Sequence, residues 1–258
     1  MPEGDTLYQL AHRMDDALAG RVLVGCDIRV PSFATLDLTG ETVHGVVSRG
    51  KHLLIRVGGL TIHSHLKMEG AWELYRPGAR WRKPAHEARI VLSTAGVVAI
   101  GFKLGILEVI DRAREQDVLG FLGPDLLGPD WDPAEAIRRL ESDPGRPIAV
   151  ALLDQRNLAG VGNEYANEIC FLRGMLPTRP VGEAGLPQTV DLARRLLVAN
   201  RDRSIRTTTG NLRRGETTWV YRRAGQPCRR CGAIVQTSEL GRSPLELRTT
   251  FFCPRCQT

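Results

Sequence analysis

Residues 227–232 read PCRRCG and residues 248–257 read RTTFFCPRCQ, which places two Cys-x2-Cys pairs 21 residues apart. Each pair fits a tight turn that presents two sulfurs to one metal ion. In a reducing compartment this spacing predicts one four-thiolate zinc site rather than two disulfides. Since all four ligands are protein thiolates, no coordination position is left open, and we expect one structural Zn2+ whose binding supplies folding free energy. The predicted ligands are Cys228, Cys231, Cys253 and Cys256.

The positive charge of the chain is concentrated around this cysteine-rich end. The 258 residues carry a formal net charge of +6, but residues 201–258 hold 12 Arg and four acidic residues, whereas residues 1–200 hold 23 basic and 25 acidic residues. Such a basic end suggests a polyanion partner, nucleic acid first, although a basic surface that only confers solubility has the same composition. The arginines around the predicted zinc site, which favour phosphate contact, are Arg222, Arg223, Arg229, Arg230, Arg242, Arg248 and Arg255.

The composition excludes several classes of protein. Hydrophobic residues make up 42% of the chain and charged residues 25%, which is ordinary for a globular protein and excludes wholesale disorder. No apolar stretch approaches the 18 residues of a transmembrane helix, and the start MPEGDTLYQL lacks the basic and apolar regions of a signal peptide. We therefore expect a cytoplasmic protein, in which the isolated Cys26 and Cys170 are small core residues.

The N-terminal part of the chain changes from a helical to a strand pattern. Residues 5–19 carry apolar side chains at helical spacing, with Asp5 as the expected N-cap and Gly20 as the stop. Short Val- and Ile-rich runs follow with no helix between them, which predicts an antiparallel sandwich or barrel within a domain of residues 1–117. The predicted strands are 21–30, 42–48, 52–57, 60–66, 71–75, 88–94, 97–102 and 106–110.

A mostly helical region separates the sandwich from the zinc module, so the fold class is α+β with several domains. A linker rich in Gly, Pro and Asp occupies 118–132, a helical domain is expected at 133–222, and the zinc ribbon at 223–258. Within the helical domain, 203–222 is expected to be a basic loop with little regular structure. The segments with helical spacing are 133–142, 147–156, 163–173 and 188–202.

The turn Gly160-Val161-Gly162-Asn163 stands before one of these helices, where Asn163 is placed to cap it. Free N–H groups and the positive end of the helix dipole at such a turn also form an anion site. A turn and a cap explain the same residues without any ligand, so the motif alone leaves both interpretations open.

The N-terminus offers a candidate nucleophile. Pro2 follows Met1, and removal of the initiator Met would leave a secondary amine with a pKa of about 8, against about 10.4 for Lys. Such an amine attacks an aldehyde-like carbon to give an iminium, and Glu3 is placed to move protons beside it. Many chains begin Met-Pro for no catalytic reason, and Pro-Glu before a helix is ordinary capping, so these residues alone favour no chemistry.

Taken together, the N-terminal PEG, the sandwich, the motif NLAGVGNEYANEI at 157–169 and the cysteine ribbon resemble one family. The chain is similar over its whole length to the formamidopyrimidine-DNA glycosylase/endonuclease VIII proteins, which are bifunctional base-excision enzymes. The resemblance implies a β-sandwich with flanking helices, a helix–two-turn–helix domain and a zinc ribbon. It also implies a nucleoid-associated monomer that binds damaged double-stranded DNA, needs no small-molecule cofactor and has no membrane partner.

The resemblance implies a role for each matching residue. Pro2 matches the Schiff-base nucleophile and Glu3 the general acid/base. Lys51, one of only four lysines, matches a hairpin lysine that donates a proton and contacts phosphate. Arg248 matches the ribbon arginine that binds phosphates around the flipped nucleotide and is implicated in δ-elimination. Asn163 matches an asparagine that grips the DNA backbone.

The resemblance also implies a role for Met68, and three departures from the family pattern bear on the branch. Met68, in HLKMEG, matches a side chain that fills the gap left by the extruded base. The segment Phe102-Lys103-Leu104-Gly105 stands where the 8-oxoguanine branch has Arg-x-Phe-Gly, which makes Lys103 a candidate DNA contact. The loop at 203–222 is short for a lid over an oxidised purine, and Asp5-Thr6 replace the Pro-Glu that many members have after PEG.

These departures favour the endonuclease VIII branch, which removes oxidised pyrimidines through a proline Schiff base and β,δ-elimination. An 8-oxoguanine/formamidopyrimidine glycosylase is the alternative within the enzyme class. A non-catalytic protein that binds damaged DNA is the alternative outside it, although such a protein has no need of Pro2, Glu3 and Lys51 together. A ribosomal or transcriptional zinc-ribbon protein would explain only the C-terminal end.

Overall fold

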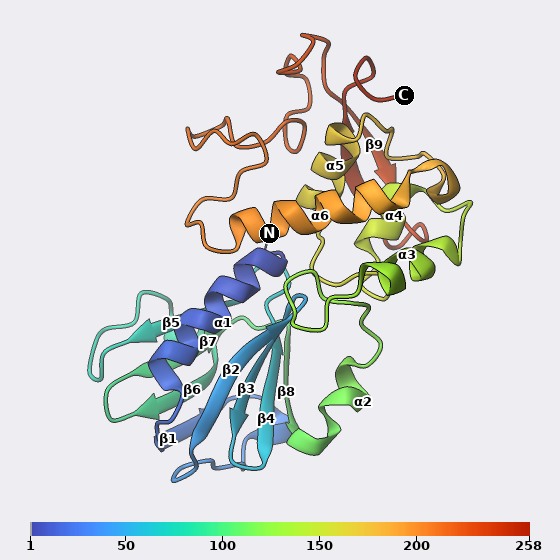
Figure 1. Ribbon diagram of the computed structural model, residues 1–258. Helices are drawn as coiled ribbons and strands as arrows, with labels where there is room; N and C mark the ends of the chain where they lie inside the picture. Colours follow the sequence, from blue (N-terminus) through green and yellow to red (C-terminus); the bar gives the residue numbers. More distant parts are fainter. Residues whose placement is uncertain (1) are drawn as a thin grey trace. The chain divides into compact units, whose positions relative to one another are not determined.

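The computed structural model describes residues 2–258, and their contacts group them into two compact units (Figure 1). The first unit contains Pro2 and residues 6–121. The second unit contains Glu3–Asp5 and Leu122–Thr258, so three residues from the start of the chain belong to the C-terminal unit. The boundary falls after Phe121, inside the segment 118–132 that we expected to be a linker.

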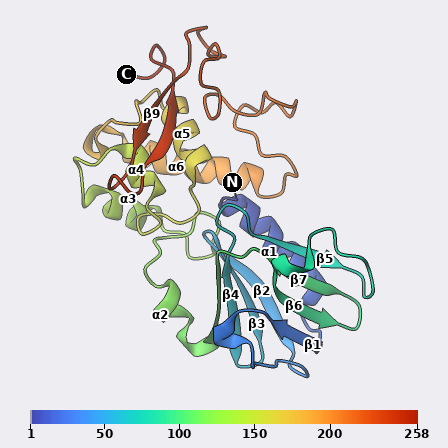
Figure 2. The same cartoon turned by 180° about the vertical axis from the view of Figure 1, so that it is seen from behind.

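The first unit is an antiparallel sandwich of two four-stranded sheets (Figure 2). One sheet has the order β1-β6-β7-β5 and the other the order β2-β3-β4-β8. Alternate residues of the strands, such as Ile55, Ile62, Ile90 and Leu92, face a common core from which water is excluded. All eight predicted strands are confirmed. They are β1 (Leu23–Ile28), β2 (Val43–Arg49), β3 (His52–Val57), β4 (Leu60–His65), β5 (Ala71–Tyr75), β6 (Ala88–Thr94), β7 (Val98–Phe102) and β8 (Ile106–Asp111).

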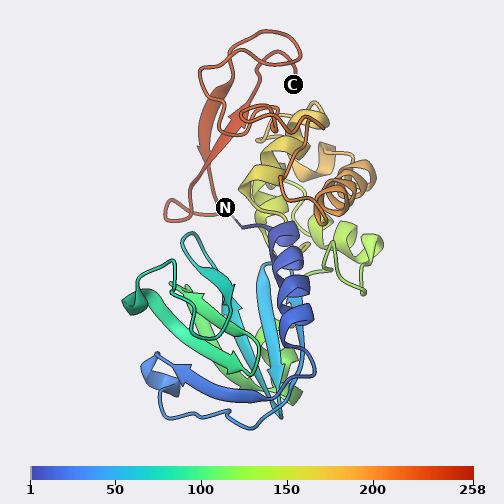
Figure 3. The same cartoon turned by 90° about the vertical axis from the view of Figure 1, so that its left-hand side faces the viewer.

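Helix α1 (Gly4–Leu18) packs beside the sandwich and completes its core (Figure 3). Leu7, Met14 and Leu18 are each 1% exposed or less, as the helical spacing predicts. The helix ends before Gly20, whose left-handed φ of +74° favours glycine and confirms the predicted stop. The prediction of Asp5 as N-cap was wrong, because the helix already begins at Gly4 and Asp5 lies in its first turn.

A short helix, α2 (Glu115–Leu119), ends the first unit and was not predicted. Its five residues are too few to show a helical period. The carboxylate of Glu115 accepts two hydrogen bonds from Arg56, of 2.9 and 2.8 Å, and one from the Thr61 hydroxyl of 2.6 Å. These contacts with β3 and β4 stabilise α2 where local sequence preference does not.

The second unit packs four helices and a two-stranded hairpin around its own core. Leu126, from the expected linker, is fully buried in this core together with Tyr165 and Leu197. The structure has neither helix nor strand between Asn200 and Gln236, which confirms the predicted irregular loop at 203–222. The elements are α3 (Pro133–Glu141), α4 (Ile148–Leu153), α5 (Asn163–Leu172), α6 (Leu186–Asn200), β9 (Gln236–Leu240) and β10 (Arg248–Phe252).

Three sequence expectations about composition can be compared with the structure. Among the residues described, 2–258, no helix is long and apolar enough to cross a membrane. Cys170 is fully buried in α5 as expected, whereas Cys26 is only partly buried and lies at the margin of the sandwich core.

Candidate functional site

The Glu3 side chain caps the N-terminus of helix α5. It is fully buried, and its two carboxylate oxygens accept hydrogen bonds from three backbone N–H groups: Gly162 at 2.7 Å, Glu164 at 2.8 Å and Tyr165 at 3.4 Å. These are N–H groups that a helix start leaves without an intrahelical partner, and the helix dipole also stabilises a negative charge there. The anion site considered at this turn is therefore occupied by a carboxylate of the chain itself.

Glycine is required where the N-terminal segment meets this turn. A Cβ atom on Gly162 would lie 2.4 Å from the carboxyl carbon of Glu3, and one on Gly4 would lie 2.9 Å from the Cα atom of Gly160. The Gly4 N–H donates to the Gly160 carbonyl at 2.9 Å. The glycines of the motif thus serve the close approach of backbone and carboxylate, and not only a tight turn.

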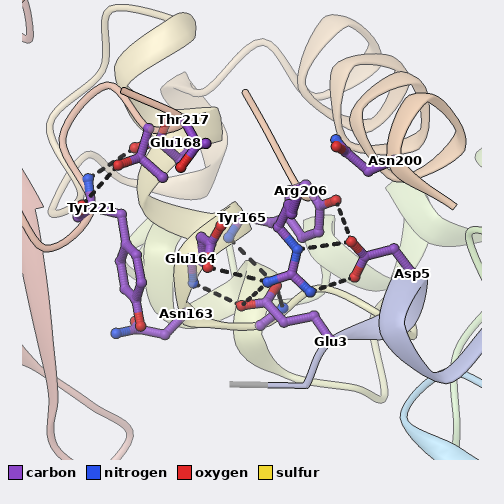
Figure 4. Close-up of polar contacts among 12 residues, drawn as sticks. Glu3, Asp5, Asn163, Glu164, Tyr165, Glu168, Asn200, Arg206, Thr217 and Tyr221 are labelled. Atoms are coloured by element: carbon purple, nitrogen blue, oxygen red, sulfur yellow. Dashed lines mark hydrogen bonds and ion pairs between the residues drawn. The ribbon is translucent and has the colours of Figure 1, made fainter. Parts of the chain in front are cut away.

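The guanidinium of Arg206 lies among the carboxylates of Glu3, Asp5 and Glu164 (Figure 4). Its Nε and Nη2 atoms donate to the two oxygens of Asp5 at 2.7 and 2.5 Å, and Nη1 lies 3.1 Å from Glu164 Oε2. The same Nη1 atom lies 3.9 Å from Glu3 Oε1. The Tyr165 hydroxyl donates to Asp5 at 3.0 Å, and its ring centroid lies 5.0 Å from the guanidinium carbon. Sequence reasoning missed this cluster entirely.

Asn163 does not cap helix α5, so that prediction was wrong: Gly162 is the N-cap and Asn163 is the first helical residue. Its Nδ2 atom donates to the Thr249 carbonyl at 2.9 Å, and the next turn of the helix adds a bond from the Phe251 N–H to Asn167 Oδ1 at 2.5 Å. Two asparagines therefore attach α5 to strand β10. Arg248, the exposed first residue of β10, is the direct neighbour of Thr249. Glu3, Asn163 and Arg248 thus belong to one connected part of the second unit.

Lys51, Met68 and Lys103 lie at one end of a sheet in the first unit. Strand register pairs His52 with His65 and His65 with Ile106, so the turns before β3, after β4 and before β8 share that end. Lys51 lies in the β2–β3 hairpin as predicted, and Met68 is 62% exposed. Lys103 has a φ of +45° and an ion pair of 2.9 Å with Glu87, and its N–H donates to the Glu87 carbonyl.

The histidines His52, His63 and His65 form a cluster next to Lys51 that was not singled out from the sequence. His52 Nδ1 is 2.8 Å from His63 Nε2, and His63 Nδ1 is 3.2 Å from a Glu108 carboxylate oxygen. Burial lowers the pKa of His52 to about 3, helped by repulsion from His65, His63 and the two nearby lysines. Burial likewise lowers the pKa of His65 to about 4. The His52 and His65 rings are therefore neutral at physiological pH.

The four cysteines of the ribbon meet as their spacing predicts. Their Sγ atoms lie within 4.8 Å of one another, with separations of 4.0 Å for Cys228 and Cys256 and 3.4 Å for Cys231 and Cys253. A tetrahedral thiolate site with metal–sulfur bonds of about 2.3 Å needs sulfur separations of about 3.8 Å. The cluster can therefore hold a metal ion.

The N-terminal nucleophile is the one site prediction that depends on a residue outside the described part of the chain. Pro2 is half-buried and directly precedes Glu3, but the expected removal of Met1 lies outside residues 2–258. Pro2 and Lys51 belong to the first unit, whereas Glu3, Asn163 and Arg248 belong to the second.

Comparison with known proteins agrees with this geometry. Residues 1–103 match the model of the formamidopyrimidine-DNA glycosylase N-terminal domain, and residues 122–208 match that of its H2TH domain. "Probable endonuclease 8 2" of Streptomyces coelicolor is 54% identical over 265 residues, which cover 100% of this chain and 94% of that protein. The chain belongs to the formamidopyrimidine-DNA glycosylase/endonuclease VIII family. The resemblance and the α+β fold class are thereby confirmed.

Within this glycosylase family, the chain is similar to proteins of the endonuclease 8 type. The protein "DNA-(apurinic or apyrimidinic site) lyase Nei2" of Mycolicibacterium smegmatis is 54% identical, with 100% of this chain and 99% of that protein covered. MutM in complex with DNA containing carbocyclic 8-oxo-G has the same fold, with a TM-score of 0.83 at 24% identity and both chains covered completely. Lactococcus lactis Fpg in complex with DNA containing an abasic site gives a TM-score of 0.81 at 25% identity over both whole chains.

Proposed function

We propose that this glycosylase-family protein is a bifunctional DNA glycosylase and AP lyase of base excision repair, which excises oxidised bases, pyrimidines first, from double-stranded DNA. The observation that carries the proposal is the burial of Glu3 on the first turn of α5, one residue after Pro2. This contact caps α5, and it also holds a carboxylate beside the N-terminal residue, where the proposed reaction needs a group that moves protons. Full-length relatives named as endonuclease 8 and as AP lyase support the reaction class.

The chemistry starts at Pro2 once Met1 has been removed. Its secondary amine attacks C1′ of the damaged nucleoside and loses its proton, and the base leaves with the electron pair of the glycosidic bond. The C1′–O4′ bond of the resulting aminal then breaks, O4′ takes up a proton, and an iminium forms between Pro2 and the ring-opened sugar. Loss of a proton from C2′ then expels the 3′ phosphate, and a further elimination expels the 5′ phosphate. Extrusion of the base from the duplex costs a few kcal/mol, and less for a damaged pair.

Other residues of the chain would serve this reaction at separate points. Glu3 is placed to move protons at the sugar attached to Pro2. Lys51 would donate a proton and contact phosphate from its hairpin, while Asn163 and Arg248 would hold the DNA backbone near the extruded nucleotide. Met68, with 62% of its surface exposed, is available to fill the gap in the duplex. We expect the protein to act as a monomer at the nucleoid, where its substrate is.

The cysteine cluster would hold one zinc ion. Four thiolates form a donor set that suits zinc and leaves no position for water, so the ion would stabilise the ribbon and take no part in the reaction. Only a small core surrounds it, formed by Phe171, Val220 and Val235 with the cysteines Cys228 and Cys253. The ribbon therefore depends on the metal for much of its folding free energy.

Borohydride trapping tests the proposed nucleophile directly. Reduction of the iminium gives a stable covalent adduct between protein and abasic DNA, and N-terminal mass measurement shows whether Met1 is absent. We expect the adduct from the chain that begins at Pro2 and none from a preparation that retains Met1. Trapping that survives Pro2→Gly and Pro2→Ala unchanged would place the nucleophile elsewhere.

The alternatives have distinct outcomes. A non-catalytic binding protein would bind an abasic duplex without cutting it, so a nicking assay separates it from the lyase. An 8-oxoguanine glycosylase would prefer an 8-oxoguanine duplex to a dihydrouracil duplex. The segment Phe102-Lys103-Leu104-Gly105 favours the pyrimidine branch, because the fully buried Phe102 stands where the purine branch has the arginine of Arg-x-Phe-Gly that contacts the orphaned base.

A further inference from the structure

We propose that Arg206 is a positioning residue for the N-terminal catalytic segment, an inference that rests on the proposed function of Pro2 and Glu3. Arg206 comes from the basic loop after α6, within the arginine-rich end that suggests a nucleic-acid partner. The structure turns its guanidinium inward instead, and only 13% of the side chain is exposed. A guanidinium this buried is directed at partners within the protein.

The first argument is geometric. Arg206 forms a two-pronged contact with Asp5, at 2.7 and 2.5 Å, and the Tyr165 hydroxyl donates to the same carboxylate at 3.0 Å. Such a fork fixes both the position and the orientation of a carboxylate. Asp5 lies in the first turn of α1, two residues after Glu3. Holding Asp5 therefore fixes the backbone that carries Glu3 and, through the chain, Pro2.

The second argument concerns charge. Three carboxylates surround the one guanidinium: Glu3 is fully buried, Asp5 is 2% exposed, and the Glu164 side chain is 15% exposed. Buried like charges repel strongly unless a cation compensates them. Glu3 also has its three backbone N–H donors, whereas for Glu164 the cation in contact is Arg206, at 3.1 Å. Without Arg206, one of the three carboxylates would have to bind a proton, or the carboxylates would have to move apart.

The charged state of Glu164 depends on this contact. Burial raises its pKa, the Arg206 cation lowers it, and the negative charge of Glu168 raises it. Asp5 and Glu3 face the same guanidinium. The positive charge of the amino terminus also lowers this pKa, but less than Arg206 does. Loss of Arg206 removes the larger lowering contribution, so Glu164 would become protonated at a higher pH. The acid limb of the reaction should then move to higher pH, which a role confined to packing would not produce.

The experiment measures single-turnover borohydride trapping on an abasic duplex as a function of pH, together with affinity for that duplex. For Arg206→Met we expect trapping to slow by about 100-fold at neutral pH, because displacement of a reacting group by about 1 Å has that cost. We expect affinity to change less than threefold and the acid limb to move to higher pH. Arg195→Met, at an exposed ion pair with Asp191 on α6, is the matched control and should behave as wild type.

Two further variants keep the proposal testable if Arg206→Met does not fold. Arg206→Lys retains the charge without the fork, and Asp5→Asn removes one partner while retaining its shape. Each should slow trapping about tenfold or more, and the effects of Arg206→Lys and Asp5→Asn should not add in the double variant. Trapping within twofold of wild type for folded Arg206→Met, or for both of the other variants, would overturn the role of Arg206. A wild-type chain that gives no adduct would instead overturn the proposed function.

Discussion

Substitution of Glu3 by Gln tests whether this carboxylate caps helix α5. One Glu3 oxygen accepts from Gly162 and Tyr165 and the other from Glu164, so a glutamine oxygen can serve only one of these positions. If it remains with Gly162, the glutamine NH2 group faces the Glu164 N–H and leaves it without an acceptor. An unsatisfied buried N–H costs about 1–3 kcal/mol. Loss of the charge at the helix start adds about 0.3–1 kcal/mol.

The substitution also has a stabilising effect that partly offsets this loss of stability, because Gln removes a negative charge beside Asp5 and Glu164. We therefore expect a net local destabilisation of about 1–3 kcal/mol at the first turn of α5. Hydrogen exchange of individual amides measures that quantity at the residue concerned, and exchange of the Glu164 amide should become about 5- to 150-fold faster. Glu141→Gln, the same chemical change at the exposed end of α3, should leave this exchange unchanged. Equal exchange at Glu164 in wild type and Glu3→Gln would refute the capping role.

Two other perturbations have outcomes that the structure specifies. Removal of the metal by a chelator should unfold 223–258 before the rest of the second unit and abolish tight binding to abasic DNA; a β9–β10 hairpin whose amides stay protected in the metal-free protein would contradict a structural metal. Acidification should destabilise the first unit, because His52 and His65 have pKa values of about 3 and 4 in the folded chain and about 6.5 when unfolded. The unfolded chain thus binds more protons between about pH 6.5 and pH 3, so stability is complete above pH 6.5 and falls below it. Thermal unfolding should show a shallower loss with acid for His52→Gln, and an identical loss would argue against the buried neutral ring.

Local pattern predicted the elements of this chain well, and the reason is visible in them. Strand β6 alternates buried and less buried residues, and α1 repeats Leu7, Met14 and Leu18 on one face, so these elements carry their own periodicity. Strands β3, β4 and β7 are instead short, nearly continuous buried runs between turn residues. The five residues of α2 show no period, and contacts of Glu115 with distant strands stabilise that helix. Pattern reasoning therefore succeeds where burial follows a period or a short continuous run, and fails where one long-range contact decides the structure.

The site residues also divide into those that a local motif predicts and those that only a long-range contact reveals. The cluster of four cysteines was predicted because the chemistry of a metal site fixes their spacing, and Pro2 and Glu3 were proposed as site residues because they stand in a recognisable motif. Arg206 could not be found, since its partner Asp5 is 201 residues away and it lies in an irregular loop that carries no periodic pattern. The capping of α5 was assigned to Asn163 for the same reason. A side chain next to the helix start is the default N-cap. Nothing in the sequence around α5 shows that Glu3, 161 residues before Glu164, accepts the hydrogen bonds of its first turn.

The burial of arginines changes what the charge of the C-terminal end predicts for DNA binding. Of the 12 arginines after residue 200, Arg206 is bound to carboxylates, and Arg223 is 7% exposed and donates to the carbonyls of Trp219 and Pro227 at 2.7 Å each. Neither guanidinium can contact phosphate without leaving these partners. At most ten of these arginines then neutralise phosphates, so they should contribute a slope no steeper than about −9 to the logarithm of the binding constant against the logarithm of salt concentration. Arg248→Ala should reduce the magnitude of the slope by about 1, whereas Arg223→Ala should lower thermal stability and leave the slope unchanged. A slope that falls equally in both variants would mean that Arg223 turns outward on DNA, and the inward contacts seen here would not describe the bound state.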